Sequence, residues 1–85
     1  VLQYLGEFET AIEILLEASN VLPDEYEIEY RLAGLYFLMD DVTKGNLHLI
    51  NGMKLEPKHL TLFQELFPVV WERTEVQNTI LKFKK

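Results

Sequence analysis

A chain of 85 residues and 10.0 kDa is long enough for one small domain, and its 48% of hydrophobic residues is a globular composition. The formal net charge of -6 argues against binding to nucleic acid or to an anionic membrane surface. No apolar run is long enough to span a bilayer, and the absence of cysteine excludes disulfides and cysteine–zinc sites.

The first helix is expected over residues 8–22. Its acids recur at helical spacing along one face: Glu9, Glu13 and Glu17. Most of its other residues are apolar, so we expect this helix to be buried on more than one side. Gly6, just before it, suits a turn that needs a positive φ, and Pro23 ends it.

The next two helices are expected over residues 25–39 and 42–55. Asp24 fits the N-cap position of the first of them. A pair of aspartates at positions 40 and 41 forms the turn between the two helices, because aspartate tolerates the left-handed φ that such a turn needs. Pro57 ends the second helix.

Two further helices are expected over residues 59–71 and from residue 74 to the C-terminus. Pro68 lacks a backbone donor and clashes with the preceding turn, so the first of these should break near Phe67. Thr74 and Gln77 fit a capping box at the start of the last helix, and the lysines of its last turn favour the helix dipole. No pattern of alternating runs joined by a tight turn indicates a strand, so the sequence predicts an all-α fold.

A shift of the sequence by 34 residues aligns residues of the same kind. Prolines meet at 23 and 57, leucines meet at 15 and 49, and small residues meet in the pairs Ala11–Gly45 and Ala18–Gly52. The small residues of each pair lie two helical turns apart on one face. Since a glycine inside a helix costs about 1 kcal/mol relative to alanine, we expect close packing there. Gly45→Leu or Gly52→Leu should lower the stability by about 1–3 kcal/mol.

This pattern resembles the tetratricopeptide repeat (TPR) family, whose unit is a pair of antiparallel helices of 34 residues. The resemblance rests on leucine, aromatic, small and proline positions: Gly6, Ala11, Ala18, Pro23, Leu32, Ala33, Tyr36, Gly45, Gly52 and Pro57. It implies a right-handed solenoid of helix-turn-helix units within a single domain, 1–85. Its parts are a partial first repeat (1–25), a full repeat (26–59) and a degenerate terminal helix pair (60–85) that caps the array. The chain is then expected to be the C-terminal part of a longer repeat protein.

In this family the first helix of each unit lines a concave groove that binds peptides. Carried over position by position, the resemblance implies these groove residues: Tyr4, Glu27, Tyr30, Gly34, Phe37, Gln64 and Trp71. The aromatic members would supply contact area at low entropic cost. Packing in the core or cap is the alternative for Phe37 and Trp71. Some family members grip a terminal carboxylate with cations, but positions 30, 34 and 64 carry none here, so that activity is not implied.

The sequence therefore predicts a scaffold or adaptor that binds another protein or peptide and is not an enzyme. It offers no nucleophile beside a base, no metal-ligand cluster and no glycine motif for phosphate, so neither a metal nor a cofactor is expected. Residues 1–30 carry eight acids and no Lys or Arg. This asymmetry favours a basic or apolar partner segment, although solubility alone is an alternative explanation.

Two other roles stay open at this point. The chain could be a structural cap with no ligand of its own, or a segment that self-associates weakly through Leu2 and Leu5 at its N-terminal end. Neither nucleic acid nor membrane insertion is expected. The compartment is left undetermined, with the cytoplasm as the default, because a targeting segment would lie before residue 1.

Overall fold

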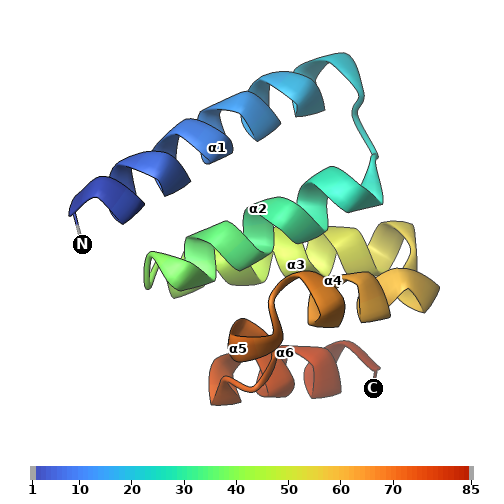
Figure 1. The fold of residues 1–85 in the computed structure, drawn as a ribbon. Coiled ribbons are helices and arrows are strands. Elements are labelled where there is room, and N and C mark those ends of the chain that lie inside the picture. The colour runs from blue at the N-terminus through green and yellow to red at the C-terminus, as the bar shows by residue number, and fades with distance from the viewer. Residues whose placement is uncertain (1, 85) are drawn as a thin grey trace.

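The computed structural model describes the backbone of residues 2–84 and the side chains of residues 7–84. Its elements are α1 (Leu2–Val21), α2 (Tyr26–Leu38), α3 (Val42–Leu55), the short 3₁₀ helix η1 (Pro57–His59), α4 (Leu60–Leu66), α5 (Pro68–Trp71) and α6 (Thr74–Lys84) (Figure 1). Every element in this range is a helix, so the predicted all-α class is confirmed.

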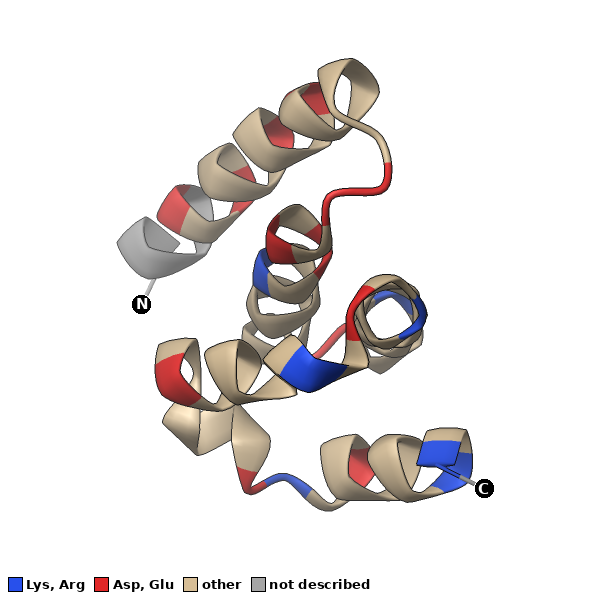
Figure 2. Cartoon of the chain, turned by 90° about the vertical axis from the view of Figure 1, so that its right-hand side faces the viewer, with Lys and Arg blue, Asp and Glu red and all other residues tan. Residues whose placement is uncertain are grey.

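The helices surround α2, which packs against α1, α3, α4 and α5. Seen from the side, α2 and α4 lie in one layer, and α3 and α6 lie in a second layer to the right of it (Figure 2). Contacts between α3 and α6 join the second layer. The chain therefore forms a hairpin, α2–α3, onto which the following segment from η1 to α6 packs.

The first helix, α1, is continuous from Leu2 to Val21. A turn was predicted at Gly6, between two helices of a partial first repeat, and this prediction is wrong because the helical backbone runs through position 6. A single glycine costs a helix only about 1 kcal/mol relative to alanine. That is too little to end a helix in which leucine and glutamate, both good helix formers, flank the glycine.

Only one side of α1 is buried. Ile12 is 6% exposed and packs with Ile28 and Leu32 of α2. By contrast, Ile14 is 62% exposed and Val21 is 78% exposed. The expectation that this helix is buried on more than one side is therefore wrong, because among the described elements only α2 makes extensive contact with it.

The turn between α2 and α3 uses both aspartates as predicted. Asp40 has a φ of 60°, in the left-handed region that aspartate tolerates better than most residues. Asp41 then caps α3, because its Oδ1 accepts a hydrogen bond from the backbone N–H of Lys44 at 3.2 Å. The observed bounds of α3 are those predicted.

The predicted break near Phe67 is also confirmed. Leu66 ends α4, Phe67 is non-helical with φ -134° and ψ 66°, and Pro68 begins α5. The backbone N–H of the first residue of a helix has no partner within the helix. Proline, which lacks this N–H, is therefore tolerated there. The chain therefore resumes as a short helix at an angle to α4 (Figure 1).

Two predicted helix caps differ from the structure. Asp24 has a φ of 65° and lies one residue before the N-cap of α2, which is Glu25. Gln77 does not close a capping box; its Nε2 donates to the backbone carbonyl of Trp71 at 2.6 Å. The lysines at the end of α6 do lie in its last turn as predicted, at Lys82 and Lys84.

Two clusters of buried side chains hold the fold together. The main core lies between the α2–α3 hairpin and the segment from α4 to α6, and its fully buried members are Tyr30, Ala33, Phe37, Leu49, Phe63 and Val76. The smaller core joins α1 to α2 through Ile12, Ile28 and Leu32. Residues 60–84 are thus tightly tied to α2–α3, whereas α1 is attached along one side only.

Candidate functional site

An open groove crosses the face of α2 that lies between α1 and the α4–α5 junction. We call it the front groove, and its lining residues are Ala11, Ile14, Leu15, Arg31, Leu35 and Phe67. Its volume is about 360 Å³. All lining residues except Arg31 are apolar. The groove therefore suits an apolar segment of a ligand rather than a polar small molecule.

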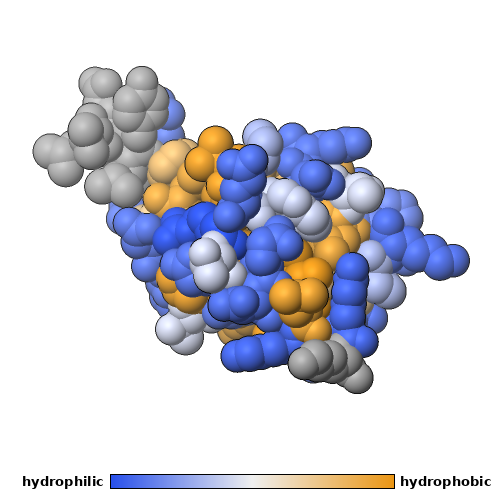
Figure 3. All heavy atoms as spheres, turned by 90° about the horizontal axis from the view of Figure 1, so that it is seen from below, coloured by the Kyte–Doolittle hydropathy of each residue, from blue (hydrophilic) through white to orange (hydrophobic). Residues whose placement is uncertain are grey.

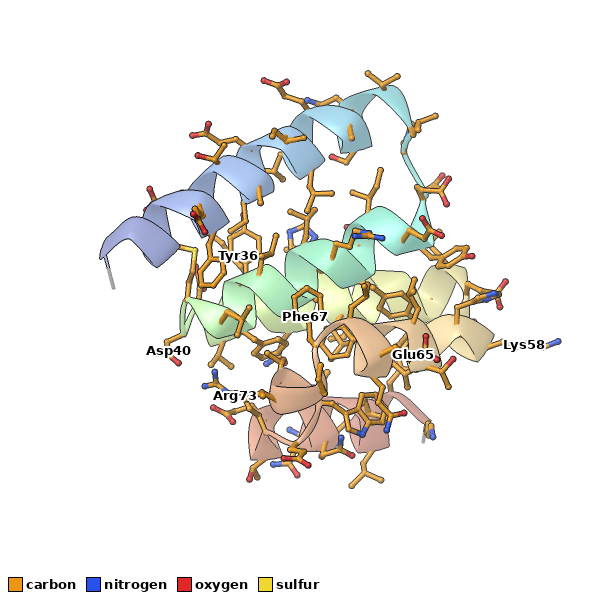
Figure 4. The ribbon with its side chains drawn as sticks, in the orientation of Figure 1. Tyr36, Asp40, Lys58, Glu65, Phe67 and Arg73 are labelled. Carbon is orange, nitrogen blue, oxygen red and sulfur yellow. The ribbon has the colours of Figure 1, made fainter. Side chains whose placement is uncertain are left out.

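The Phe67 wall of the groove is fixed by the helix break. Phe67 is the non-helical residue between α4 and α5, and its ring lies over α2 (Figure 4). It packs directly on Gly34, where a Cβ would overlap the Cγ, Cδ2 and Cε2 atoms of the ring. The ring also contacts Phe63, with centroids 5.8 Å apart. Glycine at position 34 therefore makes this wall possible.

The other side of the groove comes from α1 and the floor from α2. Ala11 and Leu15 are half-buried, whereas Ile14 projects into solvent. On the floor, Leu35 is half-buried and Arg31 is exposed. Arg31 forms no ion pair with any residue whose side chain the structure describes. The guanidinium is thus free to meet a ligand group.

Three of the predicted groove residues are in the core, which corrects the prediction for them. Tyr30 and Phe37 are each 0% exposed, and Gly34 is buried under Phe67. The Tyr30 hydroxyl donates a hydrogen bond to the backbone carbonyl of Glu56 at 2.9 Å. Burial, and then the nearby Glu56 carboxylate, raise the pKa of Tyr30 to about 12.

The remaining predicted groove residues do not form one surface either. Glu27 on α2 and Gln64 on α4 are exposed. Trp71 is half-buried against the main core, with its ring centroid 6.4 Å from that of Phe63. Phe37 and Trp71 thus pack in or against the main core, which was the alternative to a place in the groove. The side chain of Tyr4 lies outside the described residues.

The close packing predicted at two repeat glycines is confirmed. A Cβ on Gly45 would lie 2.9 Å from Cδ2 of Phe37, and one on Gly52 would lie 2.8 Å from Cε1 of Tyr30. Real Cβ atoms do not approach neighbours so closely. The two glycines of α3 therefore let the rings of α2 rest on its backbone, which holds this helix pair together.

The other repeat positions have mixed surroundings. Leu32 and Ala33 are fully buried, and Tyr36 is half-buried beside the smaller core. In α1, Ala18 packs at the edge of that core, whereas Ala11 lines the front groove. The two prolines are exposed: Pro23 follows α1 and Pro57 begins η1.

A polar cluster joins α2 to α3 on the side away from the main core. The Glu29 carboxylate contacts His48 Nδ1 at 2.9 Å and accepts a hydrogen bond from Asn51 Nδ2 at 3.2 Å. The His48 ring stacks on Tyr36 with centroids 5.4 Å apart. These contacts tie α2 to α3.

Arg73, which the sequence did not single out, ties the α5–α6 junction to the end of α2. Its guanidinium donates to the backbone carbonyl of Phe37 at 2.7 Å and pairs with Glu75 and Asp40, each at 3.2 Å. A cation at this place also complements the C-terminal end of the helix dipole. The hydrogen bond to Glu75, ahead of the one to Asp40, raises the pKa of Arg73. A hydrogen bond from its own backbone amide, ahead of the one from Arg73, lowers the pKa of Glu75.

Sequence reasoning missed most of the front groove. On α2 it selected positions 30 and 34, whereas the groove is lined one residue later, by Arg31 and Leu35. One signal was available: Phe67 stands beside Pro68, where a break was predicted. At this break the ring of Phe67 packs on Gly34 of α2.

Among the described residues no cluster of three or more His, Asp or Glu side chains could hold a metal ion. None of the helices in this part of the chain is sufficiently long and apolar to cross a membrane. Comparisons of the chain with family models, with characterised proteins and with solved structures found no match.

Proposed function

We propose that the protein is a non-catalytic protein-binding module whose front groove receives an apolar segment of another protein. The supporting observation is the groove itself, an open and largely apolar surface that three separate parts of the chain build. Ile14, at 62% exposure, offers contact area that no described neighbour covers. Exposed apolar residues that gather beside a hollow, with charged groups at its edge, are typical of binding surfaces.

The repeat architecture belongs to the same proposal. We propose that α2–α3 is a full TPR-like unit and that the segment from η1 to α6 is a degenerate second unit that caps a right-handed solenoid. The glycine–aromatic packing of Gly45 and Gly52 supports the first part. The proposal that the segment from η1 to α6 is a cap is supported by the polar residues Asn78 and Lys82, which are both exposed on α6. From the α5–α6 end, hydrophilic side chains separate the apolar patches (Figure 3).

Charge favours a partner segment that is basic beside its apolar residues. The described charged residues of α1, one wall of the groove, are all glutamates: Glu7, Glu9, Glu13 and Glu17. They would attract Lys or Arg on the flanks of a bound segment and raise its rate of association. Arg31 on the floor would donate a hydrogen bond to a carboxylate or carbonyl oxygen of the same segment.

A selection from a random peptide library displayed on phage tests the proposal. The selected peptides are then measured against the parent protein, against a groove variant with Ile14→Ala and Arg31→Ala, and against a control variant. The control carries Leu81→Ala and Lys58→Ala, a matched loss of one exposed aliphatic side chain and one exposed cation outside the groove. Leu81 is 60% exposed, close to the value for Ile14.

We expect the groove variant to bind the selected peptides at least about tenfold more weakly, and the control to bind like the parent. Equal helical content by circular dichroism in all three proteins keeps the comparison valid. If the library yields no specific peptide, or if both variants lose affinity equally, the front groove is not the binding surface.

A further inference from the structure

Asn51 and Gly52 form the one Asn-Gly pair in the sequence, whereas the asparagines at positions 20, 46 and 78 precede larger residues. The side-chain amide of asparagine is open to attack by the backbone nitrogen of the following residue, which makes asparagine a thermolabile residue. Glycine leaves that nitrogen the most accessible, because it has no Cβ and the widest choice of backbone conformations. A covalent change of asparagine is therefore chemically easiest at this pair.

In the folded chain Asn51 belongs to the polar cluster between α2 and α3. Its Nδ2 donates a hydrogen bond to Glu29 Oε1 at 3.2 Å, and the other oxygen of Glu29 contacts His48 Nδ1 at 2.9 Å. The Glu29 side chain is half-buried, with 18% of its surface exposed. Two nitrogen atoms of α3 thus hold this carboxylate, and one of them is the atom that deamidation removes.

The helix keeps this pair unreactive while α3 is intact. The backbone of Gly52 lies within the hydrogen-bonded ladder of α3, and its nitrogen must leave that ladder to reach Cγ of Asn51. Tyr30 opposes this opening twice. Its ring rests on Gly52, and its hydroxyl donates to the backbone carbonyl of Glu56, just past the end of α3, at 2.9 Å. The reaction therefore needs the end of α3 to open, and helix ends open more readily than helix centres.

We propose that Asn51 is a deamidation site whose rate is controlled by the opening of the end of α3. In the opened segment the Gly52 nitrogen gives its proton to hydroxide and attacks Cγ of Asn51. The Cγ–Nδ2 bond breaks, Nδ2 takes a proton from water and leaves as ammonia, and a cyclic imide remains. Water then opens the imide at either carbonyl to give aspartate or isoaspartate, so no oxidant or reductant takes part. The inference goes beyond the proposed function, because it concerns the tie between α2 and α3 and not the front groove.

The products would turn an attractive contact into a repulsive one. In place of an amide donor, a second carboxylate would face Glu29 in a half-buried place, where water screens like charges less than at an open surface. Only His48 would then remain to hold the Glu29 carboxylate. Isoaspartate also adds a methylene group to the backbone, which breaks the regular rise of the helix. Deamidation at Asn51 thus loosens α3 from α2.

Timed incubation of the folded protein in mildly alkaline buffer, followed by trypsin digestion and mass spectrometry, tests the site. Trypsin cuts after Lys44 and Lys54, so a single peptide, 45–54, carries both Asn51 and Asn46. Fragment ions assign the gain in mass to one of the two positions, and samples digested without incubation give the background. We expect the gain at Asn51 and none at Asn46 over the same period, and a faster gain at Asn51 in the urea-unfolded chain.

Two variants separate opening of α3 from unfolding of the whole chain. Tyr30→Phe removes the hydroxyl that bonds the Glu56 carbonyl, so the rate at Asn51 should rise about fivefold. Arg73→Ala is the matched control, because it also loses a hydrogen bond to a backbone carbonyl, that of Phe37, but at the α5–α6 junction. We expect the rate at Asn51 in this control to equal that of the parent. Circular dichroism checks that both variants remain folded.

Asn51→Asp reproduces one of the products directly. It should lower the melting temperature by about 4–8 °C. The loss should disappear in the Glu29→Gln background, where an amide faces the new carboxylate. Asn46→Asp is the control for added charge, since it lies on the same helix and Thr79 Oγ1 still has an oxygen to donate to. We expect its melting temperature to stay close to that of the parent.

The same measurements name the results that would overturn the proposal. An unchanged Asn51 in the folded chain, with reaction in the unfolded chain, would remove the site. Equal rates in the folded and unfolded chains would show that α3 does not control the reaction. Equal acceleration by Tyr30→Phe and Arg73→Ala would assign it to unfolding of the whole chain. An Asn51→Asp variant as stable as the parent would contradict the loosening of α3 from α2.

Discussion

Gly52→Ala should be destabilising in this protein even though alanine is the better helix former. Gly52 lies in the last turn of α3, and the ring of Tyr30 rests on it. A Cβ there would lie 2.8 Å from Cε1, 2.9 Å from Cδ1 and 3.1 Å from Cζ of Tyr30. The ring cannot move aside easily, because Tyr30 is 0% exposed and its hydroxyl is bonded to the end of α3.

Two opposing effects set the size of the change. Replacing a mid-helix glycine by alanine stabilises a helix by about 1 kcal/mol. Forcing an extra methyl group into a well-packed core costs about 1–3 kcal/mol. The free energy of unfolding should therefore fall by up to about 2 kcal/mol. If the ring is removed, only the first effect remains and the sign reverses.

Urea denaturation followed by circular dichroism measures both cases in a double-mutant cycle. The second background is Tyr30→Val, which ends at Cγ and so lacks all three ring atoms next to Gly52. This background is less stable, so all four proteins are measured in the same stabilising osmolyte. In the Tyr30→Val background, Gly52→Ala should raise the free energy of unfolding by about 1 kcal/mol. An equal gain in both backgrounds would refute the packing argument, because the coupling energy would then be zero.

Three further changes test other contacts. Tyr30 keeps its proton in the folded chain up to a pKa of about 12, while the unfolded chain releases it near 10. The stability that this group contributes is therefore intact below pH 10, and about 2 kcal/mol of it is lost by pH 12. The melting temperature of Tyr30→Phe should fall less steeply than that of the parent between pH 10 and pH 12. Equal slopes for the two proteins would contradict this. Arg73→Ala should lower stability by about 1–3 kcal/mol through loss of the bond to the Phe37 carbonyl, and Arg73→Lys should recover only part of it in the same melts. Asp40→Asn should change stability by less than about 1 kcal/mol, because this carboxylate is 83% exposed; a larger loss would show that the Asp40–Arg73 pair holds the turn.

Local signals in the sequence were sufficient for most helix boundaries. The bounds of α3 could be predicted because an Asp-Asp turn precedes it and Pro57 follows it. The break at Phe67 follows from the chemistry of Pro68 alone. The close approach at Gly45 and Gly52 could be predicted because glycine within a helix costs stability. Its presence there indicates that packing leaves no room for a methyl group. In each case the cause lies within a few residues of its effect.

The errors concern features that depend on a neighbouring helix. The apolar residues of α1 predicted burial on several sides, but periodicity does not show how many helices are present to cover a face. The tie made by Arg73 joins residues 36 positions apart in the chain, and no local pattern indicates it. The turn at Gly6 was placed by analogy with a repeat unit, and the continuous α1 has no such turn.

The groove was misplaced because packing by α3 and by Phe67 covers the predicted face of α2. The rings of Tyr30 and Phe37 rest on Gly52 and Gly45 of α3, and both side chains are 0% exposed. At the break before Pro68, the ring of Phe67 packs on Gly34. The predicted face is thereby closed and becomes core. The open face moves about 100° around α2, to Arg31 and Leu35, where α1 supplies the opposite wall. The packing of α3 and of Phe67 on α2 thus determines which side chains of α2 stay exposed.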